Sequence, residues 1–213
     1  MPDSLSVPSL LGAPPLLGAP RPRASRILAV LLIITGAIGW FAAFRLTVDK
    51  LQLLVHPQSP LDCNFSVLVQ CERNLESWQG SVFGFPNPLM GLGGFVAPIA
   101  VGVAVLAGAH FSRWFWLAFN FGVAGAMALV VWLMAQSIFV LGTLCPYCLL
   151  TWSVVIPMFL ALTTRNAREG VFGPGLRTTG RRVTPWLVTA DVSAYLVVAV
   201  IAQLRLGWIQ SIF

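Results

Sequence analysis

Long runs of apolar residues are the feature that most constrains this sequence. Five of them lie at about residues 27–44, 89–109, 114–141, 146–163 and 185–206. A helix needs roughly 20 residues to cross the hydrocarbon core of a bilayer, and these runs are of that order. Only 9% of the residues are charged, whereas a soluble domain has about a quarter. We therefore predict an all-α integral membrane protein with five transmembrane helices.

The first 25 residues differ in composition from the rest of the chain. They are rich in Pro, Leu and Gly, and the unit Leu-Leu-Gly-Ala-Pro occurs at 10–14 and again at 16–20. Such a sequence buries too little apolar surface to fold, so we predict that 1–25 is a disordered cytoplasmic tail. The run at 27–44 is longer than the apolar core of a signal peptide, and no clear cleavage site follows it. We expect residues 26–210 to form the transmembrane domain.

The basic residues predict how the chain is oriented, because cytoplasmic loops are enriched in Lys and Arg. Placing the N-terminus in the cytoplasm puts nine basic residues on the inner side: Arg21, Arg23, Arg26, Arg113, Arg165, Arg168, Arg177, Arg181 and Arg182. The outer side then holds four: Arg45, Lys50, Arg73 and Arg205. Because the arginines cluster at helix ends, the net charge of +6 does not indicate nucleic-acid binding.

The loop at 45–88 is much longer than a simple connection, which indicates a functional segment with some structure of its own. Its intermittent apolar residues predict short helices lying on the membrane surface over the helical bundle. The loop contains Cys63 and Cys71, and the other two cysteines, Cys145 and Cys148, open the fourth span. In the predicted orientation all four lie on the outer face, in an oxidising compartment where disulfides persist.

The two cysteine pairs differ in what their spacing allows. Cys145 and Cys148 open a helix, which places their Cα atoms about 5 Å apart and within disulfide range. The free N–H groups and the positive end of the helix dipole favour a thiolate at Cys145. Cys63 and Cys71 would be about 12 Å apart in a straight helix, so a bond between them requires a bend in the loop. This arrangement predicts thiol–disulfide chemistry.

Other interpretations of the four cysteines stay open at this point. They could bind a structural zinc ion, although no histidine accompanies them. They could also form two structural disulfides in a membrane scaffold or transporter, although a CxxC disulfide closes a very small loop and stabilises little. Cys-Pro-Tyr-Cys occurs in glutaredoxin-like domains as well, but those need a βαβ context, and here the flanking segments are long apolar helices.

A wider pattern combines the cysteines with polar and aromatic residues. Its members are Cys63, Cys71, Ser77, Phe83-Gly84, Asn87, Cys145 and Cys148. In order, spacing and placement relative to the spans, they resemble the vitamin K epoxide reductase family. The resemblance covers about residues 27–163, and the fifth span is similar to that of bacterial members. Another family of quinone-linked disulfide oxidases has its CxxC before the second cysteine pair, which is the reverse of the order here.

The resemblance implies a quinone-dependent disulfide oxidase, with four of the five helices forming a bundle around a quinone pocket. In this family a thioredoxin-like partner delivers electrons to the first loop cysteine, which corresponds to Cys63. The second, Cys71, exchanges with Cys145, and Cys148 then reduces the membrane quinone. Such an enzyme supports disulfide formation in exported proteins. We expect the partner to be a separate protein of the DsbA type on the outer face.

The resemblance also implies residues for the pocket. Ser77 and Asn87 match positions that hydrogen-bond the quinone carbonyls, and Phe83 and Trp152 are expected to wall the pocket. Trp152 stands where vertebrate members carry tyrosine, so reduction of vitamin K epoxide is the weaker alternative. The Ala-, Gly- and Arg-rich composition is consistent with a high-GC bacterium. There the protein would lie in the plasma membrane and the quinone would be menaquinone, and no metal is expected.

Overall fold

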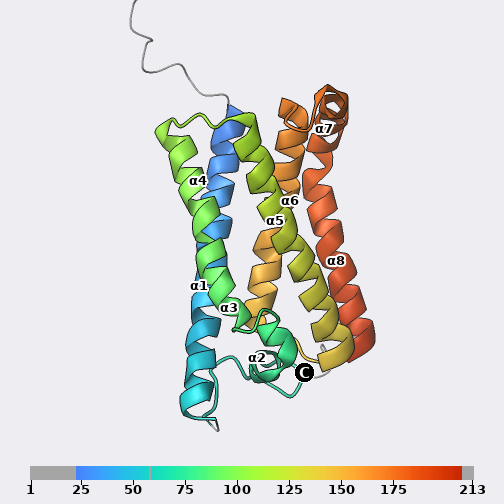
Figure 1. Ribbon diagram of the computed structural model, residues 1–213. Helices are drawn as coiled ribbons and strands as arrows, with labels where there is room; N and C mark the ends of the chain where they lie inside the picture. Colours follow the sequence, from blue (N-terminus) through green and yellow to red (C-terminus); the bar gives the residue numbers. More distant parts are fainter. Residues whose placement is uncertain (1–22, 58, 208–213) are drawn as a thin grey trace, which may run out of the picture.

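The computed structural model describes residues 23–57 and 59–207, which form helices joined by loops and one isolated bridge (Figure 1). In this part of the chain five helical segments are long and apolar enough to cross a membrane: Ser25–Val55, Asn87–Ala107, Arg113–Leu141, Pro146–Glu169 and Pro174–Leu206. The prediction of an all-α, multi-pass membrane protein is confirmed. Most of the predicted tail at 1–25 lies outside the described residues.

Several of these segments combine more than one helix. The long helices are α1 (Arg23–Val55), α4 (Val96–Ala107), α5 (Arg113–Ala135), α6 (Pro146–Glu169) and α8 (Leu187–Leu206). The short ones are α2 (Glu72–Glu76), η1 (Trp78–Ser81), α3 (Asn87–Gly94), η2 (Gln136–Leu141), η3 (Pro174–Leu176), α7 (Arg177–Val183) and η4 (Thr184–Trp186). The second span therefore comprises α3 and α4, and the third comprises α5 followed by the π-helical turn η2.

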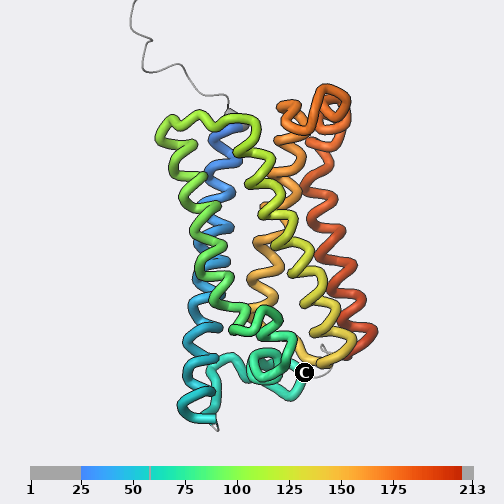
Figure 2. The backbone as a smooth tube through the Cα atoms, viewed as in Figure 1, coloured from blue at the N-terminus to red at the C-terminus, as the bar shows by residue number. Residues whose placement is uncertain are grey.

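Helix α1 is the centre of the packing. It lies against α3 and α4 on one side and against α6 on the other, while α5 packs on α6. These four spans form a bundle, and α8 lies at its edge against α6 and η2 (Figures 1 and 2). Because lipid tails are as apolar as the side chains, close packing rather than the hydrophobic effect holds such helices together.

Glycines allow α1 and α4 to approach closely. A Cβ atom on Gly102 of α4 would lie 2.6 Å from the carbonyl oxygen of Ala29 in α1. A Cβ atom on Gly36 of α1 would lie 3.2 Å from the backbone nitrogen of Ile99. The two main chains are therefore in contact at positions where only glycine fits.

Helix α1 is longer than the sequence indicates. The predicted span ends at residue 44, but the helix continues to Val55. The loop packs on this extension, where Leu53 is buried in one cluster with Leu75. Lys50 Nζ also donates a hydrogen bond to the carbonyl oxygen of Leu75, 2.8 Å away. The loop consequently begins near residue 56. The end of α1 is determined by the packing of the loop on Leu53, and the run of apolar residues in the sequence does not reveal it.

The loop lies across one end of the bundle, where it carries α2 and η1 (Figures 1 and 2). Main-chain bonds hold it against the residue that precedes Cys145. The backbone N–H of Leu144 donates to the oxygen of Leu68 (2.7 Å), and that of Gln70 donates to the oxygen of Leu144 (3.1 Å). These two bonds make an isolated parallel bridge between Val69 and Leu144.

Replacing Gly102 by Ala should lower the free energy of unfolding in lipid by about 1–3 kcal/mol, because the new methyl group meets the main chain of α1. Gly93→Ala is the matched control, since the space around the Cβ position of Gly93 is open. Denaturant-driven unfolding of both variants in bicelles measures the difference. Equal stability of the two variants would contradict the close packing of α1 on α4.

Candidate redox site

Cys145 caps the N-terminus of α6 for a local reason. Pro146 occupies the first turn of the helix, where its missing N–H group is not needed, and Cys145 precedes it with an extended backbone. The Sγ atom of Cys145 accepts a hydrogen bond from the backbone N–H of Cys148, 3.4 Å away. The sulfur therefore takes the place of the side-chain oxygen that Ser or Asp would supply at an N-cap.

This position determines the acidity of the Cys145 thiol. Burial is the largest influence and by itself raises its pKa. Hydrogen bonds from the Cys148 thiol and from the backbone N–H groups of Cys148 and Tyr147 act in the opposite direction. They outweigh burial and the nearby Asp49 carboxylate, so the pKa of Cys145 lies below that of an ordinary thiol. Because the thiolate is the nucleophile in disulfide exchange, Cys145 is suited to that reaction.

Cys63 and Cys71 form a disulfide, with their Cα atoms 5.8 Å apart. Asn64 supplies the bend that this bond requires. Its Oδ1 accepts a hydrogen bond from the backbone N–H of Cys71 (3.0 Å), and its Nδ2 donates to the Glu72 carboxylate (2.8 Å). A zinc site built from all four cysteines is incompatible with this disulfide, because two of the sulfurs are bonded to each other.

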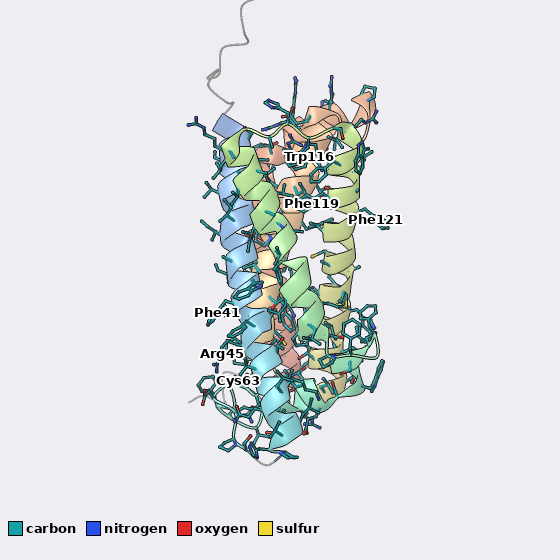
Figure 3. The ribbon with its side chains drawn as sticks, turned by 60° about the vertical axis from the view of Figure 1, so that its left-hand side comes forward. Phe41, Arg45, Cys63, Trp116, Phe119 and Phe121 are labelled. Atoms are coloured by element: carbon teal, nitrogen blue, oxygen red, sulfur yellow. A yellow bond between two sulfur atoms is a disulfide. The ribbon has the colours of Figure 1, made fainter. Side chains whose placement is uncertain are left out.

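The two cysteine pairs meet at one contact. The Sγ atoms of Cys71 and Cys145 are 3.3 Å apart, and both side chains are completely buried. Cys145 and Cys148 are free, so the loop pair is oxidised while the CxxC pair is reduced. A thiolate at Cys145 is thus within reach of a disulfide sulfur, and exchange between the pairs can run in either direction. Figure 3 shows Cys63 beside the lower part of α1, close to Arg45.

Cys148 borders a large cavity within the bundle. The cavity has a volume of about 730 Å³ and is bounded by residues of α1 to α6 and of η1 and η2. Its walls are mostly apolar. Ser77, Phe83, Asn87 and Trp152 all line it together with Cys148. The structure thus brings the four predicted pocket residues to the same cavity as the last cysteine.

A comparison with family models adds independent information. The model of the vitamin K epoxide reductase family matches residues 30–163. This chain belongs to that family. The matched region contains all four cysteines and the whole cavity lining, whereas α7 and α8 lie outside it. A search of curated proteins finds no match.

Membership of the vitamin K epoxide reductase family, together with the Cys63–Cys71 disulfide, supports a redox-active membrane oxidoreductase. Proteins of this family are quinone-linked in general.

The polar groups of this vitamin K epoxide reductase homologue make internal hydrogen bonds at the cavity. The Ser77 hydroxyl donates to the backbone oxygen of Asn74 (2.8 Å). Asn87 donates through Nδ2 to the backbone oxygen of Gln79 (2.7 Å) and accepts at Oδ1 from the backbone N–H of Val82 (3.1 Å). Asn87 therefore stabilises the turn that contains η1, which the sequence pattern did not indicate.

Two glutamines that line the cavity were not among the predicted site residues. Gln79 is 4% exposed, and its Nε2 donates to the Oε1 of Gln136 (3.3 Å). The Oε1 of Gln79 accepts no hydrogen bond from any described residue. Gln136 carried a signal in the sequence, because a polar side chain inside an apolar span often marks a functional position. The sequence contains no such signal for Gln79, because polar residues are common in loops.

Tyr147, inside the CxxC motif, links α6 to α1. Its hydroxyl accepts a hydrogen bond from Arg45 Nε (3.2 Å), and the Arg45 guanidinium lies 5.9 Å from the centre of its ring. Arg45 also pairs with Asp62 of the loop at 3.3 Å. One arginine thus joins α1, the loop and α6 at the level of the cysteines.

The sulfur contact predicts a specific cross-link. A Cys63→Ser/Cys148→Ser double variant retains only Cys71 and Cys145, and these should form a disulfide under mild oxidation because their sulfurs are 3.3 Å apart. Peptide mass spectrometry without reduction identifies the bond. The matched control is Cys71→Ser/Cys148→Ser, which retains Cys63 and Cys145. The Cys63 sulfur lies against Cys71 and Asp49, and the contact with Cys145 is made by Cys71. The control should cross-link more slowly, and equal yields would show that the loop is not held in this position.

Proposed function

We propose that this protein is a quinone-dependent disulfide oxidase. It takes electrons from a thioredoxin-like protein, passes them to a membrane quinone and so supports disulfide formation in exported proteins. The observation that carries the proposal is the position of the sulfurs. The loop pair and the CxxC pair touch at 3.3 Å, and Cys148 lines the cavity. Electrons can therefore pass from the loop to the cavity through sulfur atoms alone.

The transfer requires a short series of thiol–disulfide exchanges. A thiolate of the partner attacks Cys63 and releases Cys71 as a thiolate, and the partner's second thiolate then frees Cys63. Cys71 attacks Cys145 of an oxidised CxxC pair, which releases Cys148 at the cavity. Cys63 finally attacks Cys71, which restores the loop disulfide and releases Cys145. The bonding pattern of the structure is the one reached after this last step.

The first exchange requires the loop to move. Cys63 is 2% exposed, so a partner's thiolate cannot reach its sulfur while the loop keeps its present position. The neighbouring residues are much more accessible: Phe65 is 73% exposed and Val67 is 79% exposed. In this proposal the partner docks on these apolar side chains and displaces the segment that covers Cys63.

The cavity suits a quinone in size and polarity. A bound quinone accepts two electrons and two protons and becomes a quinol. The apolar walls suit a ring and an isoprenoid tail. Asn87 keeps a second Nδ2–H for a ring oxygen, whereas the Ser77 hydroxyl, whose hydrogen goes to the Asn74 carbonyl, can accept from the hydroxyl group of a quinol. The unpaired Oε1 of Gln79 is an acceptor, so it suits the hydroxyl group of a quinol. We propose menaquinone as the quinone, on the composition of the chain.

The orientation belongs to the same proposal. The count of basic residues supports a cytoplasmic N-terminus in the plasma membrane, with the α2 end of the bundle outside, where a separate DsbA-type partner can reach it. A scaffold with two structural disulfides is not favoured, because Cys145 and Cys148 are free. Trp152 lines the cavity without a hydroxyl group, so reduction of vitamin K epoxide is not proposed.

Replacing Cys148 by Ala should abolish quinone reduction, because no sulfur then lies between Cys145 and the cavity. The assay mixes the full chain in nanodiscs with a reduced thioredoxin-like protein and menaquinone, and follows the ultraviolet absorbance of the quinone. Ser153→Ala, on the exposed side of α6, is the control and should keep full activity. Normal quinone reduction by Cys148→Ala would refute the proposed route.

Replacing Gln79 by Leu should lower kcat/KM for the quinone about tenfold, because one hydrogen bond contributes on the order of 1.4 kcal/mol or less. The measurement is a quinone titration at saturating reductant. Gln70→Leu is the matched control, since Gln70 does not line the cavity and its side chain donates to the exposed backbone oxygen of Val67. Equal kcat/KM values for the two variants would exclude Gln79 from the quinone site.

A further inference from the structure

A buried carboxylate lies directly beneath the loop disulfide. Asp49 is on the part of α1 that continues beyond the predicted span, and its side chain is 3% exposed. Its Oδ2 lies 3.5 Å from the Sγ of Cys63. The cation that pairs with it in the described part of the chain is Arg45, one turn earlier, whose Nη2 is 3.8 Å from Oδ1. Burying a carboxylate with only a distant ion pair is unfavourable, so the position calls for a functional explanation.

The contact with Cys63 changes its character with the redox state. A disulfide sulfur carries no hydrogen, so Cys63 donates nothing to Asp49 while the Cys63–Cys71 bond is intact. Once the bond is reduced, the same 3.5 Å separation allows the Cys63 thiol to donate a hydrogen bond to the carboxylate. The carboxylate is thus already in place to accept a proton from the reduced cysteine.

We propose that Asp49 is the general base that deprotonates Cys63 when the loop disulfide re-forms, a role that rests on the proposed oxidase function. In that step Cys71 is bonded to Cys145, and the Cys63 thiol gives its proton to Asp49 as its sulfur attacks Cys71. The Cys63–Cys71 bond forms, the Cys71–Cys145 bond breaks, and the electron pair leaves on the Cys145 sulfur. When the partner later releases Cys63 as a thiolate, Asp49 returns the proton.

The surroundings of Asp49 are consistent with a group that gains and loses a proton. Arg45 lies closer to its other two polar partners, at 3.3 Å from Asp62 and 3.2 Å from the Tyr147 hydroxyl, so its ion pair with Asp49 is the loosest of the three. Among the described residues, the other ionisable groups that act on Asp49 or face it are the Asp62 carboxylate and the cysteines Cys63, Cys71 and Cys145. Asp62 is 88% exposed, so the Arg45–Asp62 pair lies at the surface, whereas Asp49 is buried.

The test follows one turnover of the full chain as a function of pH. Fully reduced protein in nanodiscs is mixed with one equivalent of menaquinone, quenched in acid and alkylated, and mass spectrometry measures the Cys63–Cys71 disulfide over time. In the wild type the rate of its formation should be nearly constant between about pH 6 and the ordinary thiol pKa near 8.5. In Asp49→Asn it should be about a hundredfold lower at the acid end and should rise tenfold per pH unit.

Glu76→Gln is the matched control, because Glu76 is an exposed carboxylate of the same loop, on α2, and no contact joins it to Asp49 or Arg45 in the described part of the chain. It should keep the wild-type profile. A wild-type rate that itself rises tenfold per pH unit, or an Asp49→Asn deficit that is the same at every pH, would refute the role of Asp49, and the first of these needs no variant to fold. Loss of quinone absorbance without formation of the Cys63–Cys71 bond would also refute it. If wild-type protein reduces no quinone, the proposed oxidase function fails and the inference fails with it.

Discussion

The 3.3 Å contact between the sulfurs of Cys71 and Cys145 is the interaction on which this site depends. Disulfide exchange needs a thiolate close to the sulfur that it attacks, so two segments far apart in sequence have to be held in register. The main-chain bridge between Val69 and Leu144 does this next to both cysteines. Asn74 adds a side-chain bond from α2 to Thr143 (3.0 Å). Disulfide exchange at this site therefore depends on the loop being folded against the segment that precedes α6.

Charge is distributed on both sides of this contact. On the side of α6, helix N–H groups and the Cys148 thiol stabilise a thiolate at Cys145. On the side of α1, the Asp49 carboxylate lies against Cys63. Cys145, on the first side, is thus favoured as a thiolate leaving group. Asp49, on the other side, is placed to accept the proton of the Cys63 thiol, as proposed above. These groups suit the re-formation of the loop disulfide that the proposed oxidase cycle requires.

The transmembrane helices could be predicted from the sequence because bilayer thickness determines their length, and the CxxC pair could be placed because a helix start determines its geometry. The end of α1 at Val55 could not be predicted, because it depends on the burial of Leu53 beneath the loop. The predicted pocket residues share one cavity, but their roles there still await experiment. Gln79 and Asp49 escaped prediction because both lie in the segment predicted to be a polar loop, and only the fold brings them to Gln136 and Cys63.

The bridge between the loop and Leu144 has a consequence for how this protein can vary. Its two hydrogen bonds join backbone atoms only, so neither of them depends on the identity of the Phe65 or Val67 side chain. Phe65 and Val67 stand just outside it and project into their surroundings. Mutation can therefore rewrite this face of the loop, by natural drift or by engineering, while the spacing of the sulfurs beneath it stays the same. In the proposed function, residues that meet the partner can therefore change without altering the sulfur contact through which the electrons pass.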